Sequence, residues 1–246
     1  MKAMLMIFVA ACGGSGGGSD SNNIDGSTNG DAKVFLDAPP VVPMTIMIGG
    51  KTTETGLGGE SVVANVAMAA FASSNETTPV AMATSDAQGN FTLTVMTNGM
   101  PLDGFLRATK SGYVDLYMYP TGPFAASTTD AGVNMMTPGN RDYLNNLAGG
   151  GQMGGKGLIG LQVRDASGNP VSGATISSTP ASTYRYTNSS GLPSSNATST
   201  SSDGVAFMFN VPSGPINITA SKAGMTFKAH VVVARADKFT TTSIVP

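Results

Sequence analysis

A short pattern of turns and alternating strands occurs twice in this chain, and it limits what the chain can fold into. The second copy starts at Ser202-Asp203-Gly204, continues through apolar runs at 205–211 and 216–220, and ends at Lys222-Ala223-Gly224. The first copy starts at Ser85-Asp86, continues through 91–95 and 105–109, and ends at Lys110-Ser111-Gly112. Apolar and polar residues alternate in both copies, so one face of each strand is apolar. The repetition predicts two related β-units.

Further apolar runs, separated by turn residues, surround both copies. They lie at 43–50, 61–72, 79–84, 114–119 and 133–136, and then at 158–165, 174–177, 226–234 and 240–245, the last two as edge or closing strands. Short strands at this spacing are typical of a sandwich or barrel. Only 11% of the residues are charged, which argues against long soluble helices. The sequence therefore predicts an all-β fold, in which Tyr117 and Tyr119 pack on one face of a strand.

One short helix is expected between the two β-units. Residues 140–148 carry Tyr143, Leu144 and Leu147 at helical spacing, and Gly149, Gly150 and Gly151 follow as a stop signal. Two turns are marginal in isolation, so this helix is expected to dock between the two domains. The Gly-Gly-Lys-Gly run at 154–157 lacks the Ser or Thr of a phosphate-binding loop and is interpreted as part of a linker.

The N-terminus combines an early charge, Lys2, with an apolar run over residues 3–11 that ends Val9-Ala10-Ala11-Cys12. This resembles a bacterial lipoprotein signal. The resemblance implies that Val9, Ala10 and Ala11 form the cleavage recognition site and that Cys12 is the lipidated new N-terminus. Gly13 rather than Asp follows Cys12, which agrees with outer-membrane delivery in the familiar sorting rule.

The eleven residues before Cys12 are fewer than the roughly 15 to 30 of ordinary signals. The true start could lie upstream, or the signal could be short. The alternative is a short buried strand with an unpaired cysteine. Residues 12–40 are rich in Gly, Ser and Asn and are expected to form a tether, which would reach about 90 Å when fully stretched.

The second β-unit carries a more specific resemblance. Its run Gly-Leu-Gln-Val-Arg-Asp-Ala-Ser-Gly-Asn-Pro-Val-Ser-Gly-Ala-Thr-Ile at 160–176, together with Asn210-Val211-Pro212 and Lys222-Ala223-Gly224, resembles the carboxypeptidase regulatory-like family. The first β-unit is a weaker copy, which keeps Asp86, Gly89, Phe91, Lys110, Gly112 and Tyr113 but lacks the Gly-Asn-Pro-Val hairpin.

The resemblance implies a transthyretin-like sandwich, grouped with carbohydrate-binding-like folds, in an accessory module without catalytic residues. The predicted architecture is two tandem seven-stranded Greek-key sandwiches with a short connecting helix. Residues 1–11 form the signal, 12–40 the tether, 41–137 the first domain, 138–156 the connector and 157–246 the second domain.

Catalytic and metal chemistry are not predicted. His230 is the single histidine and Cys12 the single cysteine, which is too few for a usual zinc site or a Cys–His pair. Glu54, Glu60 and Glu76 all fall in expected loops, so no paired carboxylates are expected. The net charge of −2 gives no basic patch for nucleic acid, and no cofactor is implied.

The predicted function is that of a non-catalytic envelope lipoprotein, anchored to a membrane through acylated Cys12, that serves as a structural or protein-interaction module. Its location would be the bacterial outer membrane, and its partner an envelope protein or a glycan. The alternative is a carbohydrate-binding surface lipoprotein that uses Tyr184 and Tyr186 in an exposed excursion at 179–202. The absence of tryptophan argues against this alternative. The oligomeric state and the ligand stay open.

Overall fold

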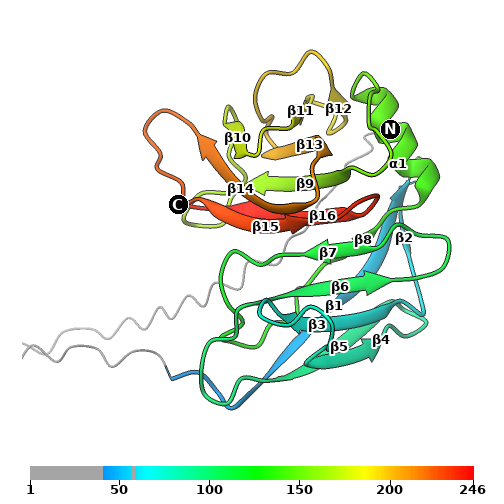
Figure 1. The fold of residues 1–246 in the computed structure, drawn as a ribbon, viewed down its shortest axis with the longest axis vertical. Coiled ribbons are helices and arrows are strands. Elements are labelled where there is room, and N and C mark those ends of the chain that lie inside the picture. The colour runs from blue at the N-terminus through cyan, green and yellow to red at the C-terminus, as the bar shows by residue number, and fades with distance from the viewer. Residues whose placement is uncertain (1–40, 57–58) are drawn as a thin grey trace, which may run out of the picture.

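The computed structural model describes residues 41–56 and 59–246. The predicted signal, the lipobox, Cys12 and the tether lie outside the described residues. Strands dominate the described part, which contains one helix, α1 (Pro138–Leu147) (Figure 1). The prediction of an all-β fold built from packed sheets is confirmed.

The first half contains eight strands in two sheets. The bounds are β1 (Thr45–Gly56), β2 (Gly59–Val62), β3 (Ala67–Ala72), β4 (Ala81–Thr84), β5 (Asn90–Met96), β6 (Gly104–Thr109), β7 (Leu116–Met118) and β8 (Val133–Met135). β1 is the centre of one sheet, where it pairs with β2, β5 and β8. The second sheet has the order β4-β3-β6-β7.

The second half also contains eight strands. The bounds are β9 (Gly157–Val163), β10 (Thr175–Thr179), β11 (Thr183–Thr187), β12 (Pro193–Ser194), β13 (Val205–Val211), β14 (Gly214–Ser221), β15 (His230–Ala234) and β16 (Phe239–Ile244). One sheet has the order β10-β14-β15, and the other runs β12-β11-β13-β9-β16.

The two halves share a pairing scheme, as the repeated sequence pattern predicts. β1 pairs with β5 in antiparallel and with β8 in parallel orientation, and β9 pairs in the same way with β13 and β16. β6 lies between β3 and β7, as β14 lies between β10 and β15. Six strands in each half follow this scheme, and two further strands, β2 and β4 in the first half and β11 and β12 in the second, make eight in place of the predicted seven. Whether each half folds independently stays a prediction.

The last strand joins the halves into one sheet. β16 pairs in parallel with β9 on one side and with β7 of the first half on the other. A single sheet of nine strands therefore runs through the whole molecule, in the order β12-β11-β13-β9-β16-β7-β6-β3-β4. The prediction that β16 is an edge or closing strand is wrong, because both of its edges are paired.

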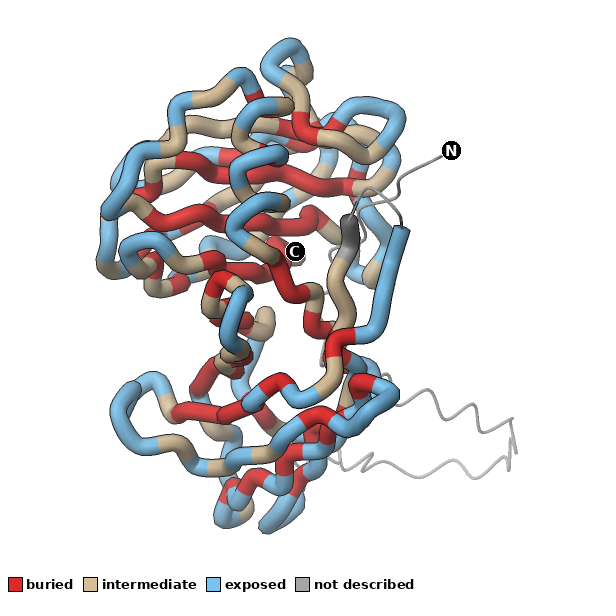
Figure 2. The backbone as a smooth tube through the Cα atoms, turned by 90° about the vertical axis from the view of Figure 1, so that its right-hand side faces the viewer, coloured by how far each residue is buried: buried red, intermediate tan, exposed pale blue. Residues whose placement is uncertain are grey.

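Each face of the nine-stranded sheet supports a core that contains residues of both halves. Figure 2 shows buried segments in the strands of both halves. The sheet formed by β1, β2, β5 and β8 packs on one face together with α1, and this core includes Met68, Leu116 and Phe207. The sheet formed by β10, β14 and β15 packs on the other face, where the core includes Phe105 and Met208. The alternation of Phe207 and Met208 between the two cores is the period-two pattern of a strand that is buried on both sides.

Two segments differ from the sequence prediction. The run at 61–72 is two strands rather than one, because the chain turns at Asn65, whose φ is +56°. Residues 179–202 do not form a single exposed excursion, since they contain β11 and β12.

Helix α1 ends before the predicted glycines but begins at Pro138, two residues earlier than the predicted run at 140–148. Thr137 is the N-cap, and its side chain accepts a hydrogen bond from the backbone N–H of Asn140 at 3.2 Å. Gly149, Gly150 and Gly151 follow with φ values of +94°, +73° and +99°, a left-handed backbone that ends the helix. Leu144 is buried in the core that contains residues of both halves, so the predicted docking between the halves is confirmed.

Candidate functional site

The two tyrosines predicted to bind a ligand do not form an exposed platform. Tyr186 lies in β11 with 6% of its surface exposed, and its hydroxyl accepts a hydrogen bond from the Ile176 backbone N–H at 2.9 Å. Tyr184 is half-buried, and its hydroxyl accepts from the Ser178 N–H, also at 2.9 Å. Burial raises the pKa of Tyr186. Both hydroxyls thus connect β11 of one sheet to β10 of the other.

A shallow pocket of about 250 Å³ lies between β1, β2 and β8 in the first half. Its lining includes Lys51, Glu60, Asn90 and Asp130, which are all exposed. The pocket is open to solvent and mixes both signs of charge, and it contains no aromatic ring on which a sugar could stack.

The carboxylates of the described residues do not gather into a metal-binding group. Within 41–56 and 59–246, no three His, Cys, Asp or Glu side chains gather around a possible metal position. Glu54 lies in β1 rather than in the predicted loop, and it accepts hydrogen bonds from the Tyr113 hydroxyl and the Asn140 amide, each at 2.9 Å. Glu76 forms an ion pair with Arg235.

The most elaborate polar arrangement lies where β16 joins the two halves. The Tyr119 N–H donates to the Thr241 carbonyl at 2.9 Å, and the Thr242 hydroxyl donates to the Tyr119 carbonyl at 2.9 Å. Lys238, just before β16, forms an ion pair of 2.7 Å with Asp115, just before β7. These contacts connect residues more than a hundred positions apart in the sequence.

Arg235, at the end of β15, is the central side chain of this joint. Its guanidinium carbon lies 4.0 Å from the ring centroid of Tyr117 and 5.0 Å from that of Phe105. One nitrogen lies 2.6 Å from the Glu76 carboxylate, and the other donates to the Tyr119 hydroxyl at 3.1 Å. Burial works against the charged form, but the hydrogen bonds to Tyr119 and Glu76 outweigh it and raise the pKa of Arg235.

The aromatic residues under Arg235 stack on one another across β3, β6 and β7. The ring centroids of Phe71 and Phe105 are 5.3 Å apart, and those of Phe105 and Tyr119 are 5.1 Å apart. Arg107 covers the outer end of this stack, with its guanidinium carbon 4.8 Å from the Phe71 centroid. Tyr117 and Tyr119 were predicted to pack on one face, and they do. The roles of Arg235 and Glu76 were missed, because no local pattern relates positions 159 residues apart.

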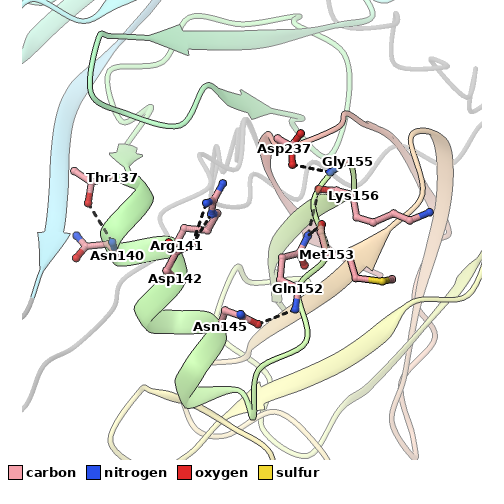
Figure 3. Close-up of polar contacts among 10 residues, drawn as sticks. All are labelled: Thr137, Asn140, Arg141, Asp142, Asn145, Gln152, Met153, Gly155, Lys156 and Asp237. Atoms are coloured by element: carbon pink, nitrogen blue, oxygen red, sulfur yellow. Dashed lines mark hydrogen bonds and ion pairs between the residues drawn. The ribbon is translucent and has the colours of Figure 1, made fainter.

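The connector between the halves is fixed by side-chain hydrogen bonds (Figure 3). Its Gln152 N–H donates to the Asn145 side chain of α1 at 3.0 Å, and the Gly155 N–H donates to Asp237 at 2.8 Å. Asn210, at the end of β13, accepts from the Met153 N–H at 2.7 Å. The segment interpreted as a linker from its glycines is therefore attached to α1, to β13 and to the connection between β15 and β16.

Comparisons with known proteins find no matching family model and no matching curated protein. Solved structures do match. The minor pilin of Streptococcus agalactiae is 13% identical, with a TM-score of 0.28, and the match covers 81% of this chain and 94% of that chain. The major pilin subunit of Bacillus cereus is 11% identical, with a TM-score of 0.28 and coverage of 82% and 99%.

A third match, the Bacillus anthracis TIE protein, is 11% identical with a TM-score of 0.25. The match covers 82% of this chain and only 34% of that one. Similarities at this level carry no function to this chain. The one helix within 41–56 and 59–246, α1, is not long and apolar enough to cross a bilayer.

Proposed function

We propose that this chain is a non-catalytic envelope lipoprotein whose two β-units act together as a rigid structural or protein-interaction spacer. The observation that supports this most strongly is the nine-stranded sheet, which passes through both halves because β16 pairs with β7 and β9. A hinge between the halves would have to break this ladder and the Arg235 cluster. The hydrogen bonds of the connector oppose such a movement as well.

The proposed anchor is Cys12, preceded by Val9, Ala10 and Ala11, with residues 13–40 as the tether to an outer membrane. Multiple acyl chains on one residue would hold the protein stably, where a single chain is marginal. The resemblance of the second half to the carboxypeptidase regulatory-like family fits an accessory role for the module. The proposed partner is another envelope protein.

Incorporation of labelled palmitate in a bacterial host tests the anchor. The unaltered chain should become labelled and fractionate with membranes, and the Cys12→Ala variant should do neither. Absence of label from the unaltered chain would remove the lipoprotein part of the proposal and leave the spacer part standing.

The spacer is tested separately by a distance measurement between the halves. In a Cys12→Ser background no other cysteine is present, so Met82→Cys and Asn217→Cys give one label site in each half. Both positions are exposed. Double electron–electron resonance should give one narrow distance distribution, whereas a broad or bimodal distribution would contradict a rigid spacer.

The contacts of Tyr184 and Tyr186 argue against carbohydrate binding, the alternative function. The hydroxyls of Tyr184 and Tyr186 bond to β10, and the Tyr186 ring is part of a core. A glycan array would still detect binding elsewhere. Glycan binding that depends on Tyr184 alone, the more exposed of the two, would restore this reading.

A further inference from the structure

An exposed group of methionines marks the beginning of the first half. Met44, Met47, Met96 and Met100 are 64%, 53%, 66% and 66% exposed. We call these four residues the methionine patch. Large apolar side chains that are exposed together, rather than scattered, usually mark an interaction surface.

Strand register places Met47 and Met96 on one outer face, and backbone hydrogen bonds place Met44 and Met100 at the adjacent end of β1 and β5. Thr45 of β1 lies opposite Met96 of β5, and Met47 lies opposite Thr94, so Met47 and Met96 are diagonal neighbours on the outer face of this sheet. The Met44 carbonyl accepts from the Thr97 N–H at 3.0 Å. The Met100 N–H in turn donates to the Thr97 carbonyl at 3.2 Å.

The outer face around the patch is uncharged over most of its length. Outward-facing residues of β1 and β5 between the strand ends are Thr45, Met47, Thr92, Thr94 and Met96, and the first charge is Lys51 at the far end. Among the described residues, the outward positions of β1 and β5 next to the patch carry no basic cluster that would attract an anionic lipid surface. The chemistry of the patch therefore suits a short apolar peptide.

The chain itself supplies such a peptide next to the patch. Residues 13–31 contain one large apolar side chain, Ile24, but residues 32–38 read Ala-Lys-Val-Phe-Leu-Asp-Ala. Four residues separate Leu36 from Val41, where the described structure begins, and they can span about 13 to 16 Å. The Val42 carbonyl already lies beside Gly99 of the 97–100 turn.

We propose that Val34, Phe35 and Leu36 of the same chain dock on the methionine patch. Methionine sulfur makes favourable contacts with an aromatic ring, and its flexible side chain adapts to the shape of an apolar partner. Covalent linkage favours this occupant over a second copy, because a short connection gives an effective concentration in the millimolar range. Docking would shorten the free tether to the residues before Ala32.

Fluorescence tests the proposal in the full chain, since the sequence contains no tryptophan. The Phe35→Trp variant should emit at shorter wavelength, and be quenched less by acrylamide, than the matched Ser27→Trp variant in the polar part of the tether. Adding Met47→Asp and Met96→Asp should abolish both differences. Circular dichroism checks that these two outer-face changes leave the fold intact.

Four outcomes would overturn the proposal. Phe35→Trp could match Ser27→Trp in emission and quenching, or its blue shift could survive the two aspartate substitutions in a folded chain. A blue shift that grows with protein concentration would assign the patch to a second copy. A blue shift that occurs only with phosphatidylglycerol-containing vesicles would assign it to a membrane. None of these results depends on whether Cys12 is acylated.

Discussion

At the scale of single residues, Arg235 shows why an arginine is suited to the joint. Its guanidinium is planar, so it lies over the ring of Tyr117 while its nitrogens reach Glu76 and Tyr119 in other directions. A lysine could place one charge but could not make the stacking contact and both hydrogen bonds together. Only 11% of the residues are charged, and one of them, Arg235, lies where the two halves meet.

Phe207 and Phe91 are the residues on which burial can be tested most directly. Phe207 is 0% and Phe91 5% exposed, and each belongs to the core on the same face of the long sheet. Phe207→Ala and Phe91→Ala should each reduce the free energy of unfolding by about 3 to 5 kcal/mol, because the cavity left behind does not fully collapse. Urea unfolding measures this. Thr94→Ala on the outer face is the control, and a comparable loss there would contradict the burial argument.

His230 should make stability depend on pH. Its Nε2 atom is buried without a hydrogen-bond partner among the described residues, and this burial lowers its pKa below the ordinary 6.5, although Asp103 opposes the shift. As the pH falls, His230 is therefore protonated in the unfolded chain at a higher pH than in the folded chain. The stabilisation is fully present above pH 6.5 and is lost as the pH falls below that value.

Urea midpoints at about pH 7.5 and about pH 5.5 measure this effect, since a histidine titrates in that interval. The unaltered chain should lose stability at the lower pH, and His230→Gln should lose much less. Asp86 and Asp165 do not interfere, because backbone hydrogen bonds hold their pKa values below 3.8 and their effect falls at more acidic pH. An equal pH dependence in both proteins would contradict the role of His230.

For the segment that contains Tyr184 and Tyr186, amino-acid composition predicted the wrong local structure. Residues 179–202 are rich in Ser, Thr and Asn, and this composition predicts a loop. Yet Tyr184 and Tyr186 lie in a strand, β11. Their hydroxyls accept hydrogen bonds from backbone N–H groups of β10, which belongs to the other sheet, and these contacts hold the segment in place. Alternation predicted the single buried face of β5 correctly, whereas β13 is buried on both faces. It could not show that a polar segment completes the edge of a sheet.

At the scale of elements, two turns repeat the same local structure. Asp86 Oδ1 accepts from the N–H groups of Gln88 and Asn90 at 2.9 and 2.8 Å. Asp165 Oδ1 accepts from those of Ser167 and Asn169 at the same two distances. The turn glycines, Gly89 and Gly168, have φ values of +80° and +82°. The Asp-x-x-Gly-Asn pattern therefore forms the same turn in both halves.

This equivalence predicts equal behaviour in two distant turns. Asp86→Ala and Asp165→Ala should lower the melting temperature by similar amounts, because each removes an acceptor for two backbone N–H groups. Asp→Asn at either position keeps one oxygen acceptor and should cost less. Differential scanning calorimetry compares the four variants, and a large effect at only one turn would show that the surroundings, rather than the turn, determine the effect.

The sequence could not show where β16, the strand that joins the two halves, lies in the sheet. Residues 240–245 read as a strand correctly, but their Thr and Ser residues suggest an edge. In the structure Thr240, Thr241, Thr242 and Ser243 are buried inside the nine-stranded sheet. Local patterns specify whether a residue is extended, whereas the neighbours of a strand depend on contacts far along the chain.

At the scale of the whole molecule, the shared sheet predicts that the two halves unfold together. The Thr242→Val variant tests this prediction. Thr242 is 0% exposed, and valine nearly preserves the shape of its side chain but cannot donate the hydrogen bond to the Tyr119 carbonyl. Leaving that buried carbonyl with fewer partners should cost about 1 to 3 kcal/mol. Hydrogen exchange measured by mass spectrometry should show protection lost in β3 and β6 as well as in β9 and β13.

Thr240 provides a matched control in the same strand. It is also 0% exposed, but its hydroxyl has no hydrogen-bond partner among the described residues, so Thr240→Val should be neutral or stabilising. If Thr242→Val reduces protection only in the second half, β16 belongs energetically to that half and the joint does not couple the two. If Thr242→Val reduces protection equally in both halves and Thr240→Val does not, the molecule unfolds as one unit. The shared strand β16 is then what couples the two halves.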